Sequence, residues 1–272
     1  MNRPDADARF SGSIPSLYQE LLVPMLFEPY AADLVARVVL RPCERVLEVA
    51  AGTGAVTRHL AALLPPASTL VATDLNQAML DLACTCGASR AVTWRQADAM
   101  ALPFDDGSFD TVVCQFGVMF FPDKAKAFAE ARRVLSPGGS FFFNVWDRIE
   151  QNEFAHTVST TMQFAFPTDP PQFLVRTPHG YADVERIQRD LALGGFRLAP
   201  EVHTVAARSH AAAPRVPAVA FCQGTPLRAE IEARDFGGLD AVTAMAEAAL
   251  AHRFGAGPVE GRMQAHVVAV TR

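Results

Sequence analysis

Short apolar runs rich in β-branched residues alternate with longer segments of mixed polarity between residues 40 and 146. Side chains repeat every two residues along a strand and about every 3.6 residues along a helix, so the short runs predict strands and the longer segments predict helices. The predicted strands lie at residues 45–49, 69–73, 92–96, 109–114 and 141–146. The predicted helices lie at residues 55–64, from the capping residue Asn76 onward, and at 122–134.

The rest of the chain shows the same two patterns less regularly. Apolar residues from Leu17 to Val39 predict at least two helices, the first of them broken by Pro24 and Pro29. A turn is predicted at Pro137-Gly138-Gly139, before the fifth strand. The later segments with a clear pattern are two predicted strands, 196–205 and 264–270, and helical pieces within 151–190 and 214–254.

Strands that alternate with helices in this way predict right-handed crossovers. We therefore expect an α/β fold with a doubly wound, mostly parallel, seven-stranded Rossmann-like sheet, its last strand antiparallel, and a helical lid. Residues 40–150 should form the core of the sheet. Residues 1–39 should add helices to the lid, while residues 151–272 should complete the sheet and supply the rest of the lid.

Composition argues against several kinds of partner. The 272 residues carry a net charge of -5, and the 24 basic residues form no run longer than two. Nucleic acid and acidic membrane surfaces are therefore disfavoured as main binding partners. No apolar stretch reaches the roughly 20 residues that span a bilayer, and no signal-peptide pattern is present, so we expect a cytoplasmic protein. The five cysteines are scattered and the close pair Cys84 and Cys86 lacks further ligands, so neither a disulfide framework nor a metal site is expected.

The most informative stretch is the first predicted strand with the turn that follows it. The turn contains four small residues, Ala50, Ala51, Gly52 and Gly54. Small residues let a ligand approach the backbone closely, and the N-terminus of the next helix presents unpaired N–H groups to that ligand. Because ligands of parallel sheets bind at the carboxyl ends of the strands, this turn predicts a site for a nucleotide-like molecule.

Two kinds of cofactor fit such a turn. A nicotinamide or flavin dinucleotide favours a third glycine where this chain has Thr57, and its pyrophosphate would be repelled by Glu48. Glu48 instead suits a cofactor that carries an ammonium or sulfonium charge. Asp74, 20 residues after Gly54, stands where a carboxylate would bind ribose hydroxyls, which both kinds of cofactor carry. These residues therefore disfavour an NAD-dependent oxidoreductase.

Five segments occur together in a characteristic order. They are Leu47 to Gly54, Thr73 to Leu80, Ala97 to Phe104, Ser108 to Gly117 and Arg133 to Gly139. With these segments the chain resembles the class I S-adenosylmethionine-dependent methyltransferases, and it is similar to the ubiquinone and menaquinone methyltransferase branch and its small-molecule, natural-product relatives. The resemblance covers roughly residues 40–146. It departs from the family at Ala50, where glycine is frequent, and at Glu48, where aspartate is frequent.

The resemblance implies S-adenosylmethionine as the cofactor and assigns roles at the sheet edge. Residues 50–54 would pass under the methionine part of the cofactor, and Asp74 would hold the ribose. Leu75 and Met79 would flank the adenine. The complete set of expected cofactor-binding residues is Glu48, Ala50, Ala51, Gly52, Gly54, Asp74, Leu75, Met79, Asp98, Ala99, Gln115 and Phe116.

The last four residues of that set have roles at the third and fourth strands. Asp98 and the Ala99 backbone would read the amino group of the adenine. Gln115 and Phe116 would lie near the sulfonium and the substrate. Since packing in the core also explains Leu75 and Met79, and a helix cap or turn also explains Asp98, these alternatives stay open at this point.

Catalysis by this class needs an acceptor atom held in line with an already activated methyl group, so a general base is optional. The expected catalytic residues are His179, Tyr181 and Tyr18, with His156 and His203 as further candidates. Packing alone would also account for Tyr181, and exposure in a loop for His179. No other catalytic motif stands out, and the only two lysines, Lys124 and Lys126, fall on a predicted helix away from the site.

We expect the chain to transfer a methyl group to an O, N or C atom of a small, largely apolar or aromatic molecule in specialised metabolism. This expectation rests on aromatic and sulfur-containing side chains in the predicted lid: Phe154, Met162, Phe164, Phe166, Phe173 and Phe221. The alternative is a protein that binds S-adenosylmethionine without methylating, as a structural cofactor or sensor. A homodimer is a further expectation.

Overall fold

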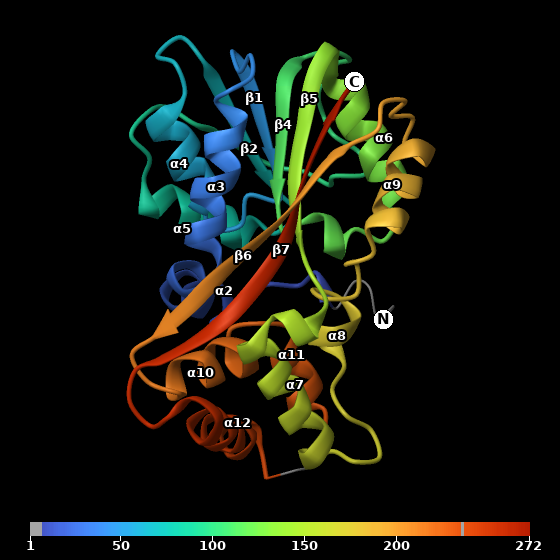
Figure 1. Cartoon of the computed structure of the whole chain (residues 1–272). Coiled ribbons are helices and arrows are strands. Elements are labelled where there is room, and N and C mark those ends of the chain that lie inside the picture. Colours follow the sequence, from blue (N-terminus) through green and yellow to red (C-terminus); the bar gives the residue numbers. More distant parts are fainter. Residues whose placement is uncertain (1–6, 235–236) are drawn as a thin grey trace. The chain divides into compact units, whose positions relative to one another are not determined.

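Seven strands form one mixed sheet in the order β3-β2-β1-β4-β5-β7-β6 (Figure 1). The computed structural model describes residues 7–234 and 237–272. The strands are β1 (Arg45–Val49), β2 (Thr69–Asp74), β3 (Thr93–Gln96), β4 (Phe109–Gln115), β5 (Leu135–Trp146), β6 (Glu201–Ala211) and β7 (Val259–Thr271). The first five strands pair in parallel, so their carboxyl ends share one edge of the sheet.

Strand β7 runs antiparallel to β5. The backbone N–H of Arg272 donates to Gly139 O at 2.9 Å, and that of Asp147 donates to Gln264 O at 3.0 Å. Residue numbers therefore rise along β5 while they fall along β7. The predicted fold class, a seven-stranded Rossmann-like sheet with its last strand antiparallel, is confirmed.

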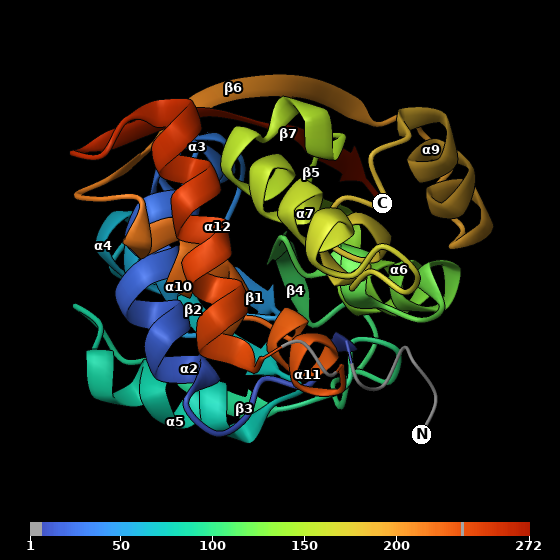
Figure 2. The same cartoon turned by 90° about the horizontal axis from the view of Figure 1, so that it is seen from below.

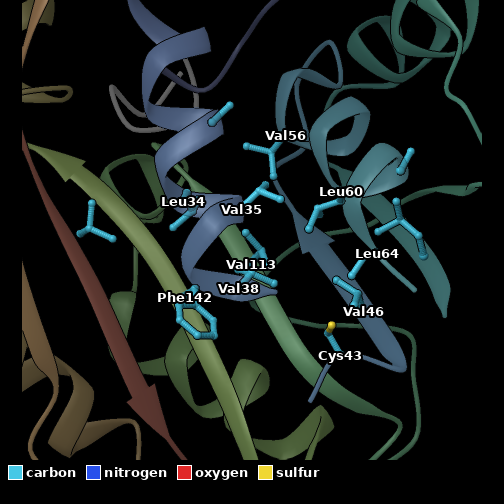
Figure 3. Close-up of a cluster of buried hydrophobic side chains, with 14 residues drawn as sticks. Leu34, Val35, Val38, Cys43, Val46, Val56, Leu60, Leu64, Val113 and Phe142 are labelled. Atoms are coloured by element: carbon cyan, nitrogen blue, oxygen red, sulfur yellow. The ribbon is translucent and has the colours of Figure 1, made fainter. Parts of the chain in front are cut away.

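Helices cover both faces of the parallel part of the sheet (Figure 1). They are α3 (Glu28–Val38), α4 (Ala55–Leu63) and α5 (Gln77–Cys86) on one face, and α6 (Lys124–Val134) and α9 (Val184–Leu193) on the other. Side chains of β5 alternate between the two: Phe142 enters the buried cluster formed with α3 and α4, shown in Figure 3. Phe141 and Phe143 instead contact Phe128 of α6, with ring centroids 5.9 and 5.5 Å away.

The chain divides into two compact units. Unit 2 comprises Glu28–Val145, Tyr181–Val205 and Ala265–Arg272, and holds the parallel strands. Unit 1 comprises the N-terminal residues through Phe27 together with Trp146–Gly180 and Ala206–Gln264. Its helical elements are α2 (Ile14–Leu17), η1 (Tyr18–Phe27), η3 (Ile149–Gln151), α7 (Glu153–Ala165), α8 (Phe173–Arg176), α10 (Arg215–Gln223), α11 (Leu227–Glu232) and α12 (Leu239–Phe254).

Within unit 1, α12 packs against both α7 and α10 (Figure 2). The predicted division into residues 1–39, 40–150 and 151–272 stays a prediction, as does the lid. Among the described residues, no helix has the length and apolar character needed to cross a bilayer.

The N-terminal helices differ from the prediction. Pro24 does not break the first helix; it lies inside η1, a π-helical segment of ten residues that continues directly into α3. Pro29 is the second residue of α3, directly after η1, and does not interrupt the helical run either. The wider turn of a π-helix forms different backbone hydrogen bonds, which explains how proline is accommodated there.

Several strands begin at other residues than predicted, and β7 starts at Val259 rather than at residue 264. Strand β5 starts at Leu135 rather than residue 141, and the segment predicted as a turn is an irregularity within it, because Phe109 pairs with Leu135 whereas Thr111 already pairs with Ser140. Strand β6 starts at Glu201, not at Phe196.

Phe196 lies instead in the core of unit 2. It follows Gly195, which has a φ of +89°, and its ring stacks on Phe141 with the centroids 6.2 Å apart. A buried aromatic residue after a helix was thus mistaken for the start of a strand. Asn76 does stand at the N-terminus of α5, but its side chain accepts no capping hydrogen bond.

Candidate cofactor site

The loop between β1 and α4 follows an unusual backbone path. Ala50, Gly52 and Gly54 have φ values of 56°, 57° and 83°, in the left-handed region that glycine adopts without strain. Ala50 is one of two non-glycine residues with positive φ among those described. The Ala51 N–H donates to Thr73 O at 2.9 Å, and the Gly54 N–H donates to Ala51 O at 2.9 Å. The loop therefore coils tightly against β2 before α4 begins.

The loop also touches the segment after β4. A Cβ atom at Gly117 would lie 2.5 Å from the Cβ of Ala50 and 2.7 Å from the Sγ of Cys114. No real side chain tolerates such distances, so glycine is required at residue 117. The methyl group of Ala50, which stands where the family often has glycine, makes this requirement stricter.

Glu48 is a buried carboxyl group, 1% exposed, at the end of β1. Its Oε2 accepts a hydrogen bond of 2.5 Å from the Thr57 hydroxyl, and Thr57 lies on the buried face of α4. Burial raises the pKa of Glu48 to about 8, against the opposing effects of the Thr57 hydrogen bond and the positive charge of Arg58. The group therefore holds its proton at neutral pH and would release it when a positive charge arrives nearby.

Asp74, at the end of β2, uses both carboxylate oxygens to hold the backbone. Oδ2 accepts from the Gly52 N–H at 2.8 Å, and Oδ1 accepts from the Asn76 N–H at 2.8 Å. Burial raises the pKa of Asp74, while these backbone hydrogen bonds counteract the rise. Asp74 thus joins the turns after β1 and β2 into one surface.

The segment after β3 lies beside the turn after β2. The Ala97 N–H donates to Asp74 O at 3.0 Å, and the Gln96 side chain donates to Leu75 O at 2.8 Å. Asp98 Oδ1 accepts from the Met100 N–H at 2.8 Å, which is the local turn contact expected of an aspartate. Ala99, next to it, is buried.

The two residues predicted to flank adenine differ in exposure. Leu75 is 51% exposed, which is unusual for leucine and suits contact with a ligand. Met79 is buried in α5. Core packing accounts for Met79 without a ligand, whereas it does not account for Leu75.

After β4 the chain turns sharply at Phe116, whose φ of 51° makes it the second non-glycine residue in the left-handed region. Its N–H donates to both the backbone oxygen and Oδ1 of Asn144, at 3.1 and 2.9 Å. The Asn144 amide lies 3.5 Å from Gln115 Oε1. The Phe116 ring meets Tyr30 edge to face, with centroids 5.4 Å apart. Asn144, fully buried in β5, therefore sets the backbone at this end of the sheet.

Apart from Met79, the predicted cofactor residues lie in segments at one edge of unit 2, which we call the cofactor edge: Glu48–Gly54, Asp74–Asn76, Asp98–Met100 and Gln115–Gly117. One atom there is left without a partner: the Oγ1 of Thr53, a residue 1% exposed. A buried hydroxyl without a hydrogen bond is costly, and a bound molecule with donor and acceptor groups would satisfy it. The edge therefore combines two buried carboxyl groups with a buried hydroxyl that a polar ligand would satisfy.

The predicted catalytic residues are distributed over both units. Tyr181 belongs to unit 2, where it is 2% exposed and its hydroxyl donates to Asp190 Oδ2 at 2.7 Å. Burial and the Asp190 carboxylate raise the pKa of Tyr181, so the phenol keeps its proton. These contacts favour a supporting role for Tyr181 over that of a base.

His179 and Tyr18 belong to unit 1. His179 Nδ1 lies 2.8 Å from Asp147 O, which assigns the proton to Nδ1 and leaves Nε2 as an acceptor. Burial lowers the pKa of His179 to about 4, so the ring is neutral at pH 7. The further candidate His156 is half-buried in α7, and His203 is exposed on β6.

Tyr18 and His179 stand in one series of ring contacts. Tyr18 stacks on Phe27 at 4.9 Å, Phe27 contacts Trp146 at 6.1 Å, and Trp146 contacts His179 at 6.2 Å between centroids. Phe10 meets Tyr18 edge to face at 5.8 Å. We call these five residues the aromatic row. The row thus links two predicted catalytic residues of unit 1 through the buried rings of Phe27 and Trp146.

Of the apolar residues expected in the lid, Phe154, Met162, Phe166, Phe173 and Phe221 are buried. Phe164 differs from these five residues because it is 79% exposed on α7.

The sequence analysis did not predict three residues of this site: two whose side chains hydrogen-bond to the cofactor edge, and a third within the glycine turn. Thr57 replaces the third glycine of dinucleotide-binding turns, and the structure gives it a further role: it stands one helical turn after Gly54, and its hydroxyl donates to Glu48. Asn144 is a single amide in the phenylalanine-rich strand β5, and that polarity was the available signal. Thr53 lies within the glycine turn itself.

The predicted resemblance to the class I S-adenosylmethionine-dependent methyltransferases is confirmed, and with it the expected cofactor. Residues 47–143 of the chain match the family model described as "Methyltransferase domain". Among the described residues, no group of three or more histidine, cysteine or acidic side chains could hold a metal ion.

Two relatives show how far the similarity extends. An uncharacterised protein of Mycobacterium tuberculosis is 37% identical over 131 residues, which is 46% of this chain and 46% of that protein. The ubiquinone/menaquinone biosynthesis C-methyltransferase of Ectopseudomonas mendocina is 31% identical over 171 residues, 58% of this chain and 66% of the relative. The chain thus spans about half the length of the mycobacterial protein.

Solved structures share the fold at low sequence identity. Phosphoethanolamine N-methyltransferase 2 of Haemonchus contortus, in complex with phosphomonomethylethanolamine and S-adenosylhomocysteine, has a TM-score of 0.60 at 17% identity, covering 100% of this chain and 61% of that one. The [4+2]-cyclase SpnF has a TM-score of 0.57 at 21% identity, covering 90% and 80%. At these identities the similarity shows the fold alone.

Proposed function

We propose that this protein transfers the methyl group of S-adenosylmethionine to an O, N or C atom of a small, largely apolar or aromatic molecule in specialised metabolism. The observation that carries the proposal is the cofactor edge: Glu48 and Asp74, both buried, lie at the ends of the neighbouring strands β1 and β2, beside a coiled small-residue loop that contains the unpartnered Thr53 hydroxyl. This arrangement suits a cation with a ribose better than a pyrophosphate.

In this proposal each part of the edge has its own task. Asp74 holds the ribose hydroxyls, residues 50–54 lie under the methionine part, and Leu75 and Met79 flank the adenine. Asp98 and the Ala99 backbone read the adenine amino group. The cofactor supplies an activated sulfonium methyl when bound. Glu48 provides a negative charge to the site once it gives up its proton.

The protein's contribution to the rate is then mainly orientation. Holding an acceptor atom in line with the methyl group can supply on the order of 7–11 kcal/mol. Gln115 and Phe116, whose backbone is fixed by Asn144, are the proposed residues beside the sulfonium and the acceptor. His179, with Nε2 as an acceptor, is the candidate base best supported by its contacts; Tyr18 and Tyr181 remain weaker candidates.

The apolar class of substrate is supported by the aromatic row of unit 1. Its five side chains, joined by four ring contacts, are of the aromatic kind that lines sites for aromatic ligands. The expected cytoplasmic location and homodimer stay predictions.

A second candidate is a protein that binds S-adenosylmethionine without methylating. The [4+2]-cyclase SpnF, a neighbour in fold, carries by its name an activity other than methyl transfer. Such a protein would keep the cofactor edge and use unit 1 for a different reaction.

Incubation of the purified protein with methyl-labelled S-adenosylmethionine and fractionated metabolite extracts separates the two candidates. The proposal expects S-adenosylhomocysteine to form only with fractions that contain an acceptor, and the label to appear in an apolar small molecule. Tight binding without acceptor-dependent turnover would favour the second candidate. Label transferred to protein would contradict the proposed substrate class.

A further inference from the structure

A lysine from the next helix holds the segment that follows β4. Lys124, the first residue of α6, is half-buried, and its side chain reaches back over η2 (Val118–Phe120). Its Nζ donates to Phe121 O at 2.9 Å and to Met119 O at 3.3 Å. These carbonyl groups belong to the turn that begins at Phe116, so the lysine contacts the cofactor edge through one short piece of backbone.

The same ammonium group lies over an aromatic ring. Nζ is 4.8 Å from the ring centroid of Tyr181, within the range of a cation–π interaction. The ring is held in turn by its hydroxyl, which donates to Asp190 of α9. The Arg186 guanidinium lies 5.2 Å from the same ring. Tyr181 therefore acts as a support for Lys124, which explains its burial without a role as a base.

Keeping a lysine in this place has an energetic cost. Burial lowers the pKa of Lys124 to about 8, and the nearby charge of Arg186 lowers it further while Asp190 opposes the shift. A methionine of similar length would avoid that cost but would donate no hydrogen bonds. The two carbonyl contacts and the ring beneath them indicate that this amino group has a specific task.

We propose that Lys124 is a positioning residue of the cofactor edge: its side-chain nitrogen fixes the backbone of Gly117–Phe121 and thereby the orientation of Gln115 and Phe116. The contact itself does not depend on the proposed function. Its consequence for methyl transfer rests on that function. The sequence analysis placed Lys124 away from the site. In this proposal its side chain instead holds the backbone next to the site in place.

The chain offers a matched control, because Lys126 is its only other lysine and is exposed on the same helix. The Phe120 and Phe121 amides donate to Gly117 O and Val118 O within the turn, so their hydrogen exchange reports on its opening. In Lys124→Met these amides should exchange roughly tenfold faster or more, while Lys126→Met should match the wild type. Lys124→Arg should restore much of the protection, since arginine can reach the same carbonyls.

A binding measurement then tests the consequence. S-adenosylhomocysteine should bind Lys124→Met about 3–10-fold more weakly, and kcat should fall further than the cofactor affinity, because Gln115 and Phe116 orient the reacting groups. Should Lys124→Met fail to fold, Tyr181→Leu removes the supporting ring and should increase exchange in the same direction, whereas Tyr181→Phe keeps the ring and should not.

The outcomes separate the two ideas. Equal amide exchange in Lys124→Met and Lys126→Met would contradict the proposal that Lys124 fixes the backbone of Gly117–Phe121. Faster exchange in Lys124→Met with unchanged S-adenosylhomocysteine affinity and turnover would contradict its positioning role. If the wild type does not bind S-adenosylhomocysteine but Lys124→Met still exchanges faster, Lys124 fixes this backbone and the proposed function is wrong.

Discussion

The cofactor edge of unit 2 and the aromatic row of unit 1 are built in opposite ways. The cofactor edge contains two buried carboxyl groups that are held by hydrogen bonds, from the Gly52 and Asn76 N–H groups to Asp74 and from the Thr57 hydroxyl to Glu48. The aromatic row consists of rings held by contacts with other rings. Polar contacts fix atoms to within tenths of an ångström, whereas ring contacts tolerate a range of angles.

The difference suggests a division of work. A universal cofactor with fixed atoms needs a rigid surface with defined donors and acceptors. In the proposed function the acceptor is a largely apolar molecule, which needs apolar area more than defined donors and acceptors. Changes at the cofactor edge should therefore cause large, specific losses, and changes in the aromatic row should cause small ones.

The largest loss is expected for Asp74→Ala. The change removes the two backbone contacts, at about 1.5–3 kcal/mol each for hydrogen bonds to charged groups, together with the proposed ribose contact. We expect S-adenosylmethionine affinity to fall at least about 100-fold in calorimetric titration. Asp81→Ala is the control, because Asp81 is exposed on α5 and bonds only to Gln77 among the contacts seen here. Equal affinity in the two variants would contradict the assignment of Asp74.

A smaller loss, of stability rather than affinity, is expected for Gly117→Ala. Its Cβ would overlap the Ala50 methyl group and Cys114 Sγ, and overpacking of this kind costs about 1–3 kcal/mol. Ala50→Gly relieves left-handed strain at residue 50 and removes one of the two overlaps. The double variant should therefore recover part of the lost stability in chemical denaturation. Additive effects of the two changes would show that the residues are not coupled in this way.

Glu48 should link cofactor binding to proton release. Its pKa of about 8 means that it is mostly protonated at pH 7, and an approaching sulfonium lowers that pKa. Affinity should therefore rise as pH increases toward 8, with release of up to about one proton per cofactor bound at pH 7. Titrations at pH 7 in buffers of different ionisation enthalpy measure this number.

Glu48→Gln provides the control, since it keeps the size and the contact to Thr57 but cannot titrate. It should bind with no proton release and with little dependence on pH. The same release in wild type and variant would assign the proton to another group. Without cofactor, the stability supplied by protonated Glu48 is present below its unfolded pKa near 4.5 and is lost as pH rises through 8.

The contrast between the two regions also explains what the sequence could predict. Glu48, Asp74 and Asp98 act on partners close in sequence or at the next strand end, so the alternation of strands and helices was enough to bring them together. The aromatic row joins Phe27 to Trp146 across more than a hundred residues, and no local pattern records that contact. The sequence therefore could not predict arrangements that depend on contacts between residues far apart in the chain.

Two local failures have the same cause. Pro24 was expected to end a helix by its intrinsic preference, yet the packed π-helical segment accommodates it. Lys124 was placed outside the site because helix periodicity locates its Cα but not the atoms that its long side chain reaches.

The smallest effect is expected in the aromatic row, for His179→Phe. In the folded protein the pKa of His179 is about 4, below its unfolded value near 6.5, so the folded state disfavours the proton. Stability from this group is present above pH 6.5 and is lost as pH falls toward 4, by about 0.5–1 kcal/mol between pH 7 and 6. In chemical denaturation, the free energy of unfolding of His179→Phe should therefore fall less between pH 7 and 6 than that of the wild type. His156→Phe should show the same fall as the wild type.

If Nε2 also accepts a proton from the substrate, kcat of His179→Phe should fall as well. Turnover that stays unchanged across pH would show that His179 is not a base and would leave only a packing role for the aromatic row.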